Sequence, residues 1–134
     1  MMKILQPAGW AKPRGYANGI AVKGGTTVYV AGQVGFNAQG IFEEKNFSGQ
    51  FRQTLKNTLA VLAEAGGGPE HIVRMTWYVV DKREYLDSLK EVGAAYRELI
   101  GKHYPAMAVV QVGALIEDEA RLEIETIAVI PEKP

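Results

Sequence analysis

Apolar side chains recur every three or four positions in two stretches of the chain, which predicts two amphipathic helices. The first helix starts near Phe51 and ends at residues 66–69, where three glycines and a proline favour a helix end. The second starts after Asp81, whose carboxylate can form a capping box with Glu84, and ends at Gly101. The apolar stripes are Phe51, Leu55, Leu59, Leu62 and Ala65 in the first helix and Tyr85, Leu89, Val92, Tyr96 and Leu99 in the second.

Short runs rich in β-branched and apolar residues predict five strands around these helices. The first two runs are joined by Gly24 and Gly25, so we expect them to form a β-hairpin. The resulting order, ββαβαββ, indicates an α+β fold of two layers, with both helices packed on one face of a mixed sheet. The predicted strands cover residues 19–23, 26–33, 72–80, 106–115 and 121–130.

The strand over residues 72–80 has one strongly apolar face, so we interpret its Trp77 as a core residue. Two helices cover only one face of the sheet, yet both faces of the strand over residues 106–115 are mostly apolar. Burial of that second face predicts a homo-oligomer with clefts where sheet faces meet. Gly93 inside the second helix predicts a close approach of a strand. The residues expected on the apolar face of this strand are Val73, Met75, Trp77 and Val79.

Composition excludes several classes of function. The chain has 134 residues, 15 Lys and Arg against 15 Asp and Glu, and no Cys, which fits a single domain over residues 1–134 without disulfides. Zero net charge disfavours nucleic acids and membrane surfaces as partners. The absence of a signal-peptide pattern or a membrane span favours a cytoplasmic protein. Isolated histidines, His71 and His103, and only two serines predict neither a metal centre nor a serine nucleophile.

Few residues remain that could carry chemistry. Glu123 and Glu125 lie two positions apart on the last strand, so their Cα atoms are about 6.6–6.8 Å apart on one face. Such carboxylates can form an acid–base pair, although a solvated strand face paired with Arg121 fits the same spacing. Tyr16 precedes the first strand and either closes a pocket or packs within a loop. Gly32 either lets a ligand approach the backbone or marks a bulge.

Six segments match one protein family in their order and spacing. They are Gly-Tyr-Ala-Asn-Gly-Ile at 15–20, Val-Ala-Gly-Gln-Val at 30–34, Gln-Thr-Leu-Lys-Asn at 53–57, Ile-Val-Arg-Met-Thr-Trp-Tyr-Val at 72–79, Tyr-Pro-Ala at 104–106 and Leu-Glu-Ile-Glu-Thr-Ile-Ala at 122–128. Over nearly its full length the chain thereby resembles the reactive intermediate deaminases, the RidA/YjgF family. The resemblance implies a chorismate-mutase-like fold and a homotrimer with three clefts between subunits that bind a small molecule.

The resemblance also implies an activity, which is the hydrolysis of enamines and imines such as 2-aminoacrylate to a keto acid and ammonia, without a metal or an organic cofactor. In that family an arginine directly after the Pro-Ala pair binds the substrate carboxylate, and a glutamate in the final strand positions water. By resemblance the glutamate is Glu123, the pocket tyrosine is Tyr16, and a glycine whose backbone lies near the ligand is Gly32. The arginine position is Met107, and Val109 replaces a cysteine found in several members.

Met107 changes the expected substrate. Hydrogen bonds to charged groups contribute about 1.5–3 kcal/mol, so loss of the arginine predicts carboxylate binding weaker by about 10- to 150-fold. Either Arg14 enters the cleft, or the substrate has no carboxylate there and Met107 and Val109 form an apolar wall; we favour the second. Ala31 also replaces the usual serine. The first hypothesis is a RidA-like hydrolase with an altered enamine or imine substrate. The alternatives are a trimeric small-molecule-binding or regulatory protein and, less favoured, an endoribonuclease.

Overall fold

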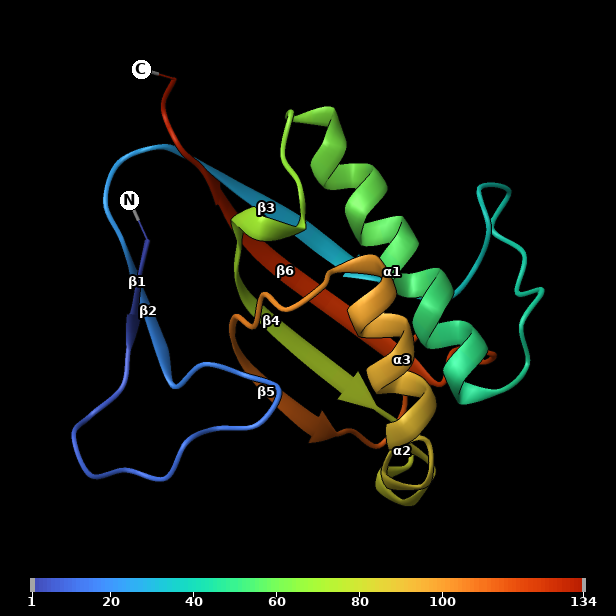
Figure 1. The fold of residues 1–134 in the computed structure, drawn as a ribbon. Helices are drawn as coiled ribbons and strands as arrows, with labels where there is room; N and C mark the ends of the chain where they lie inside the picture. Colours follow the sequence, from blue (N-terminus) through green and yellow to red (C-terminus); the bar gives the residue numbers. More distant parts are fainter. Residues whose placement is uncertain (1, 134) are drawn as a thin grey trace.

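A four-stranded mixed sheet forms the centre of the computed structural model, which describes residues 2–133 (Figure 1). Its strands are β3 (Thr26–Gln33), β4 (Ile72–Val79), β5 (Ala106–Gln111) and β6 (Leu122–Ile130). The strand order is β3-β6-β4-β5, in which β4 and β5 are parallel and the other two pairings are antiparallel. β5 is therefore an edge strand, and its residues are open to contact beyond the sheet.

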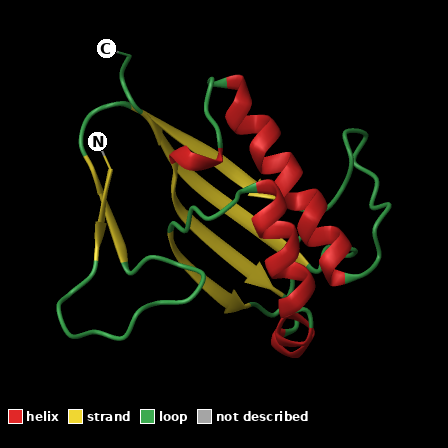
Figure 2. Cartoon of the chain, viewed as in Figure 1, coloured by secondary structure: helices red, strands yellow, loops and turns green. Residues whose placement is uncertain are grey.

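The helices lie on one face of this sheet, so the expected α+β fold class is confirmed (Figure 2). They are α1 (Phe47–Glu64), α2 (Lys82–Asp87) and α3 (Leu89–Leu99), with a short 3-10 helix at Pro69–His71. Asp81 caps α2 as expected, because its carboxylate accepts hydrogen bonds from the backbone N–H groups of Arg83 and Glu84. The Glu84 carboxylate, expected to complete a capping box, pairs instead with the Arg121 guanidinium at 2.9 Å. Within residues 2–133, no helix combines the length and the apolar character needed to cross a membrane.

The expected second helix is divided in two at Ser88. The backbone at Ser88 leaves the helical region, with φ −106° and ψ 9°, and its hydroxyl donates to the Glu84 carbonyl at 2.8 Å. A serine side chain that bonds the backbone four residues earlier competes with the helical hydrogen-bond ladder. The division places α3 as a separate helix beside α1 (Figure 1).

The expected hairpin between the first two predicted strands is wrong. β2 (Gly19–Val22) pairs antiparallel with β1 (Met2–Leu5), a strand the sequence pattern did not predict, and the two form a separate ribbon (Figure 1). Gly24 and Gly25 do adopt positive φ angles, 72° and 84°, but this turn leads the chain from one sheet to the other. β2 pairs with β1 along all four of its residues, and β3 pairs with β6 instead of with β2.

The core lies between the sheet and the helices. Its largest fully buried side chains include Phe51 and Leu55 from α1 and Leu122 and Ile124 from β6. On β4 the buried positions are Ile72, Met75, Trp77 and Val79. Val73 is only partly buried, contrary to the strict alternation expected from the sequence, because the pairing register with β6 shifts between Ile72 and Arg74.

The opposite face of the sheet carries no helix (Figure 2). It combines apolar with acidic side chains. Tyr29 on β3 is 76% exposed and Val110 on β5 is 41% exposed. Tyr78 on β4 lies between buried neighbours and therefore points to this open face, as does its cross-strand partner Glu123. This open face corresponds to the second face of the sheet, for which the sequence predicts burial by another copy of the chain.

Candidate functional site

A cavity of about 500 Å³ lies between the edge strand β5, helix α3 and the loop that carries Tyr16. Two of its walls are apolar side chains from β5 and α3, and aromatic rings supply much of the rest. It is lined by Arg14, Gly15, Tyr16, Trp77, Tyr85, Leu89, Val92, Gly93, Tyr96, Arg97, Tyr104, Met107 and Val109. Four of the six site residues expected from the sequence, Arg14, Tyr16, Met107 and Val109, meet here.

Met107 and Val109 face this cavity because of the strand register. β5 runs parallel to β4 with Met107 opposite Met75 and Val109 opposite Trp77, both of which face the helices. Met107 and Val109 accordingly pack against the core. Because β5 is the edge strand, these two side chains are only partly buried and form a wall of the cavity.

Tyr16 is held beside β5 by its neighbour in the chain. The Ala17 N–H donates to the Pro105 carbonyl at 2.9 Å, and Ala17 forms a parallel bridge with Ala106 at the start of β5. Ala17 is buried, whereas Tyr16 is 41% exposed and lines the cavity. The structure thus favours the pocket interpretation of Tyr16 over simple loop packing.

Aromatic groups in the cavity are neutral and mutually packed. The rings of Tyr96 and Tyr104 stack with centroids 5.4 Å apart, and the Tyr96 hydroxyl donates to the His103 carbonyl at 2.5 Å. Burial raises the pKa of Tyr96 well above its ordinary range, and burial also raises the pKa of Tyr85. Trp77 is 4% exposed, as expected of a core residue, yet its Nε1–H has no acceptor within residues 2–133.

Glu123 and Gly32 form a second group, on the open face of the sheet. A register shift lies between Val30 and Gln33, so Gly32 occupies a bulge in β3. The Glu123 side chain lies over Gly32 so closely that a Cβ atom at position 32 would overlap its carboxylate. The bulge weighed from the sequence is thus observed, and the missing side chain makes room for the Glu123 carboxylate, whereas approach of a ligand to the Gly32 backbone stays a prediction.

Glu125 lies on the same open face but has a different partner. Its carboxylate accepts a hydrogen bond from the Tyr78 hydroxyl at 2.6 Å. This hydrogen bond, followed by desolvation, raises the pKa of Tyr78. The Glu125 carboxylate is thus hydrogen-bonded to a phenol, whereas the Glu123 carboxylate forms no hydrogen bond or ion pair within the described residues.

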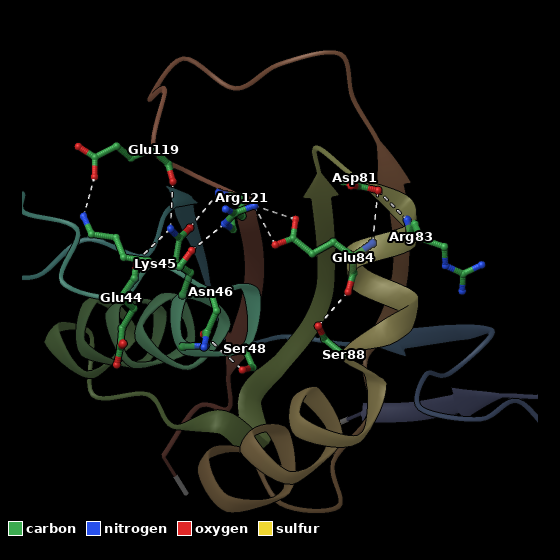
Figure 3. A network of polar contacts seen from close by, with 12 residues as sticks. Glu44, Lys45, Asn46, Ser48, Asp81, Arg83, Glu84, Ser88, Glu119 and Arg121 are labelled. Carbon is green, nitrogen blue, oxygen red and sulfur yellow. Dashed lines mark hydrogen bonds and ion pairs between the residues drawn. The ribbon is translucent and has the colours of Figure 1, made fainter.

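Polar contacts fix the start of β6 and therefore the position of Glu123 two residues later (Figure 3). The Arg121 guanidinium donates to the Lys45 carbonyl at 2.7 Å and pairs with Glu84 at 2.9 Å. The buried Gln50 side chain accepts from the Arg121 N–H at 2.8 Å and donates to the Glu119 carbonyl at 2.9 Å. Arg121 is thus used in holding β6 to its neighbours, and it does not pair with Glu123 or Glu125 as the solvated-face alternative supposed.

The two groups lie on opposite faces of one sheet. Met107 faces the helices, because it is paired laterally with the buried Met75. Glu123 faces away from them, because it is paired with Tyr78, whose chain neighbours are both buried. A single chain therefore brings Arg14, Tyr16, Met107 and Val109 together but does not bring Glu123 and Gly32 to them.

The histidines have structural roles. The His71 Nδ1 accepts from the Gly68 N–H at 2.9 Å, and the His103 Nε2 lies 2.6 Å from the Ile72 carbonyl oxygen. Among the described residues, no cluster of three His, Cys, Asp or Glu side chains has the arrangement needed for a metal ion. The described residues that line the cavity include no His, Cys, Asp or Glu, the side chains that usually bind zinc.

Sequence reasoning missed several residues of the cavity. Tyr85, Leu89, Val92 and Tyr96 are expected in the core stripe of one helix, and all four line the cavity. Tyr85, Val92 and Tyr96 also contact the core, whereas Leu89 is 48% exposed. Gly93 was expected to mark a close approach of a strand, but a Cβ atom there would meet only the guanidinium of Arg97. Gly93 and Arg97 both line the cavity, and the four-residue spacing that places them side by side on a helix was the available signal.

Comparisons with known proteins show the family and the fold of the chain. A sequence model of the family described as Endoribonuclease L-PSP matches residues 11–130, most of the chain. The chain belongs to this family, that of the RidA/YjgF proteins. A RutC family protein of Synechocystis sp. is 34% identical over 138 residues, which cover 97% of this chain and 98% of that protein.

Two further RidA/YjgF relatives bear on fold and activity. The Rid-family protein YyfB of Yersinia pestis has a solved structure that superposes with a TM-score of 0.85 at 28% identity, covering 96% of this chain and 98% of that one. The 2-iminobutanoate/2-iminopropanoate deaminase of Salmonella typhimurium is 32% identical over 117 residues, 85% of this chain and 86% of that protein. The RidA/YjgF fold is confirmed, and family membership supports reactive intermediate deamination in general.

Proposed function

We propose that the protein hydrolyses a reactive imine or enamine in clefts between the subunits of a homotrimer. The observation that carries this proposal is the separation of the two half-sites on opposite faces of the sheet, the cavity at Met107 and the carboxylate at Glu123. A neighbouring subunit that covers the open face with its own cavity edge would join one cavity to another chain's carboxylate. The partly apolar open face and the exposed edge strand β5 supply surfaces for such an interface.

The proposed reaction consumes one water and releases one ammonia. Water adds to the carbon of the protonated C=N bond, while the Glu123 carboxylate of the adjoining subunit takes up one proton from that water, which gives a neutral carbinolamine. Glu123 then returns this proton to the nitrogen and ammonia leaves. The hydroxyl of the carbinolamine loses its proton to solvent as the carbon–oxygen double bond forms, which restores the proton that the imine gained at the start. An enamine first gains a proton on carbon to become the imine. Positioned proton transfer of this kind typically accelerates a reaction by about 10²–10⁴-fold.

Met107 sets this chain apart in substrate choice. A thioether offers no charged donor, so a carboxylate directly beside β5 would lose its solvation without gaining a charged partner. Small imines such as that derived from alanine, in which the carboxylate is a large share of the molecule, are therefore expected to be poor substrates. The aromatic and aliphatic lining favours a larger and more apolar body instead.

The activity is tested with 2-imino acids generated in place by an amino-acid oxidase from a panel of amino acids. We expect the wild type to accelerate decay of at least one bulky imino acid and Glu123→Ala to lose that acceleration. Met107→Arg is expected to gain activity on small alkyl imino acids. If the wild type accelerates none of them and only Met107→Arg is active, the hydrolase proposal is wrong for this chain.

A trimeric binding protein is the alternative that Met107 itself favours, since that residue replaces the charged partner of the family substrate. Retained ligand binding with no turnover by the wild type would support it. Cleavage of RNA is disfavoured, because the net charge is zero and the cavity lining has two arginines but no basic stripe. Light scattering tests the assembly, for which about three times the 14.6 kDa chain mass is expected and a monomer mass would remove the joined cleft.

A further inference from the structure

The cavity lining combines aromatic walls with two cations and no acidic residue, and it points to a class of ligand. We infer that this cavity binds an aromatic 2-oxo or 2-imino acid, with the carboxylate held by Arg97 and Arg14 and the ring directed inward past Met107. The inference rests on the proposed function in taking this cavity as the substrate site. It differs from the family arrangement, because the anion is held by helix α3 and the Tyr16 loop rather than by β5.

The two cavity arginines are available for an anion. Arg52, Arg83 and Arg121 each pair with a carboxylate, those of Glu98, Asp87 and Glu84 respectively. The guanidinium groups of Arg14 and Arg97, in contrast, form no ion pair or side-chain hydrogen bond within residues 2–133. Two unpaired guanidinium groups on one cavity without a carboxylate attract an anion, and the planar guanidinium matches a carboxylate in two-point geometry.

Gly93 explains how Arg97 reaches this position. Gly93 lies four residues before Arg97 on α3, and a Cβ atom at position 93 would come within 3.3 Å of the Arg97 Nη1. The guanidinium therefore lies against the helix surface at Gly93, beside the cavity that both residues line. A Cβ atom at position 93 would make the guanidinium shift by a few tenths of an ångström, and a larger side chain would displace it further.

The interior of the cavity fits a ring. A volume of about 500 Å³ lies within the roughly 300–1,000 Å³ typical of sites for drug-sized ligands, well above the need of a three-carbon acid. Trp77, Tyr85 and Tyr96 offer ring faces and edges, on which aromatic groups pack in offset or edge-to-face arrangements. The buried Trp77 Nε1–H, which has no acceptor in the described chain, is a donor still free for a ligand atom.

Three probes separate charge from shape in a binding experiment on the wild-type protein. Phenylpyruvate carries both the ring and the carboxylate, pyruvate carries the carboxylate alone, and 4-phenyl-2-butanone carries the ring with a neutral ketone. Calorimetry gives the Kd, and Trp77 fluorescence reports occupancy in a Trp10→Phe background, because Trp10 is 63% exposed and would otherwise contribute. We expect phenylpyruvate to bind at least about tenfold more tightly than either other probe.

Variants of the two arginines locate the anion. We expect Arg97→Gln to weaken phenylpyruvate binding by about 10- to 100-fold, Arg14→Gln by less, and Gly93→Ala to weaken it while leaving the charge in place. Arg83→Gln is the matched control, since it removes a cation that pairs with Asp87 and lies outside the cavity lining; its Kd should equal that of the wild type. The affinity of the wild type for phenylpyruvate should also fall as ionic strength rises, whereas that for the neutral ketone should not.

The outcomes separate this inference from the proposed function. Equal affinity for phenylpyruvate and the neutral ketone, or an unchanged Kd in folded Arg97→Gln, overturns the inference even if small imines are hydrolysed. Tight, arginine-dependent binding of phenylpyruvate without turnover of any imino acid in the panel supports the inference and contradicts the hydrolase. If Arg97→Gln fails to fold, the salt dependence and Gly93→Ala decide in its place.

Discussion

The two faces of the central sheet differ in chemistry more than in structure. The helix-side edge holds an aromatic cavity with cations and no carboxylate, whereas the open face holds Glu123 and Glu125 beside a tyrosine. In the proposed hydrolysis each face supplies what the other lacks, since the cavity would bind the substrate and the open face would provide a carboxylate to handle protons. Under the proposed trimer, a complete site is therefore a property of the assembly rather than of one chain.

The difference extends to how charged groups are used. At the start of β6, Arg121 is bound to a carbonyl and a carboxylate and has a structural role (Figure 3). At the cavity, Arg97 has no such partner in the described chain. Glu123 on the open face is likewise without a partner, while Glu125 accepts from Tyr78. The proposed hydrolysis uses Glu123, and the proposed binding of an anion uses Arg97.

The largest effect is expected from removal of the Glu123 carboxylate on the open face. Glu123→Gln keeps the shape of the open face but removes the carboxylate, so turnover should fall by about 10²–10⁴-fold. Phenylpyruvate should still bind, because Arg97 and Arg14, which are proposed to hold its carboxylate, are unchanged in this variant. Glu125→Gln is the matched control, because the carboxylate that it removes is hydrogen-bonded to Tyr78. Equal loss in both variants would contradict the separate role of Glu123.

A smaller effect is expected from moving the carboxylate without removing it. Gly32→Ala places a methyl group where the Glu123 carboxylate now lies, so the flexible side chain must swing away. Displacement of a reacting group by about 1 Å can cost about 100-fold in rate, so turnover should drop by up to that amount with little change in Tm. Gly113→Ala is the control, since a Cβ atom there meets nothing within 4 Å. Full activity of Gly32→Ala would show that the position of Glu123 over Gly32 is unimportant.

The smallest effect concerns stability on the cavity side. Tyr96→Phe removes the hydrogen bond to the His103 carbonyl and should lower the free energy of unfolding by about 0.5–1.5 kcal/mol at pH 7. Burial raises the pKa of Tyr96, so its stabilising effect is complete below the unfolded value of about 10 and is lost as the pH rises beyond it.

Urea unfolding at pH 7 and above pH 10 measures this difference. The gap between wild type and Tyr96→Phe should therefore narrow at alkaline pH. Tyr29→Phe, at a side chain that is 76% exposed, should show neither effect. A gap that stays constant with pH would mean that ionisation of Tyr96 is not linked to unfolding.

The sequence was sufficient for elements with long, regular patterns. Strand β4 and the end of helix α1 are expected close to their observed bounds, because each element has many apolar positions at one period. Helix α1 starts at Phe47, about one turn before the expected start, after the cap formed by Asn46. Strand β1 was missed, since its four residues are mostly exposed and show no alternation. The hairpin was mispredicted because a Gly-Gly turn is a local signal, whereas the pairing of β2 with β1 and of β3 with β6 is decided by residues distant in the chain.

The sequence identified residues of the candidate site but did not show that they lie on opposite faces of the sheet. Strand parity and family resemblance identified Glu123 and Met107, but only the lateral pairing of Met107 with Met75 and of Glu123 with Tyr78 shows that they face opposite sides. Arg97 was missed because a charged residue on an exposed helix face looks like any solvated position. Its relation to the cavity depends on how α3 packs over β5, which no local pattern encodes.

The central claim, that each site is shared between subunits, is tested most directly by complementation. One variant, Glu123→Ala, keeps the cavity and lacks the carboxylate; the other, Gly93→Trp, keeps the carboxylate and fills the cavity. The two chains are co-expressed with different tags and mixed trimers are purified through both tags, with each homotrimer as the inactive control.

In a cyclic trimer, every mixed assembly has one complete cleft of the three, so we expect about one third of wild-type turnover per trimer from two inactive parents. Turnover no higher than that of the parent variants would contradict the account, because it would mean that one chain alone must supply both halves of the site.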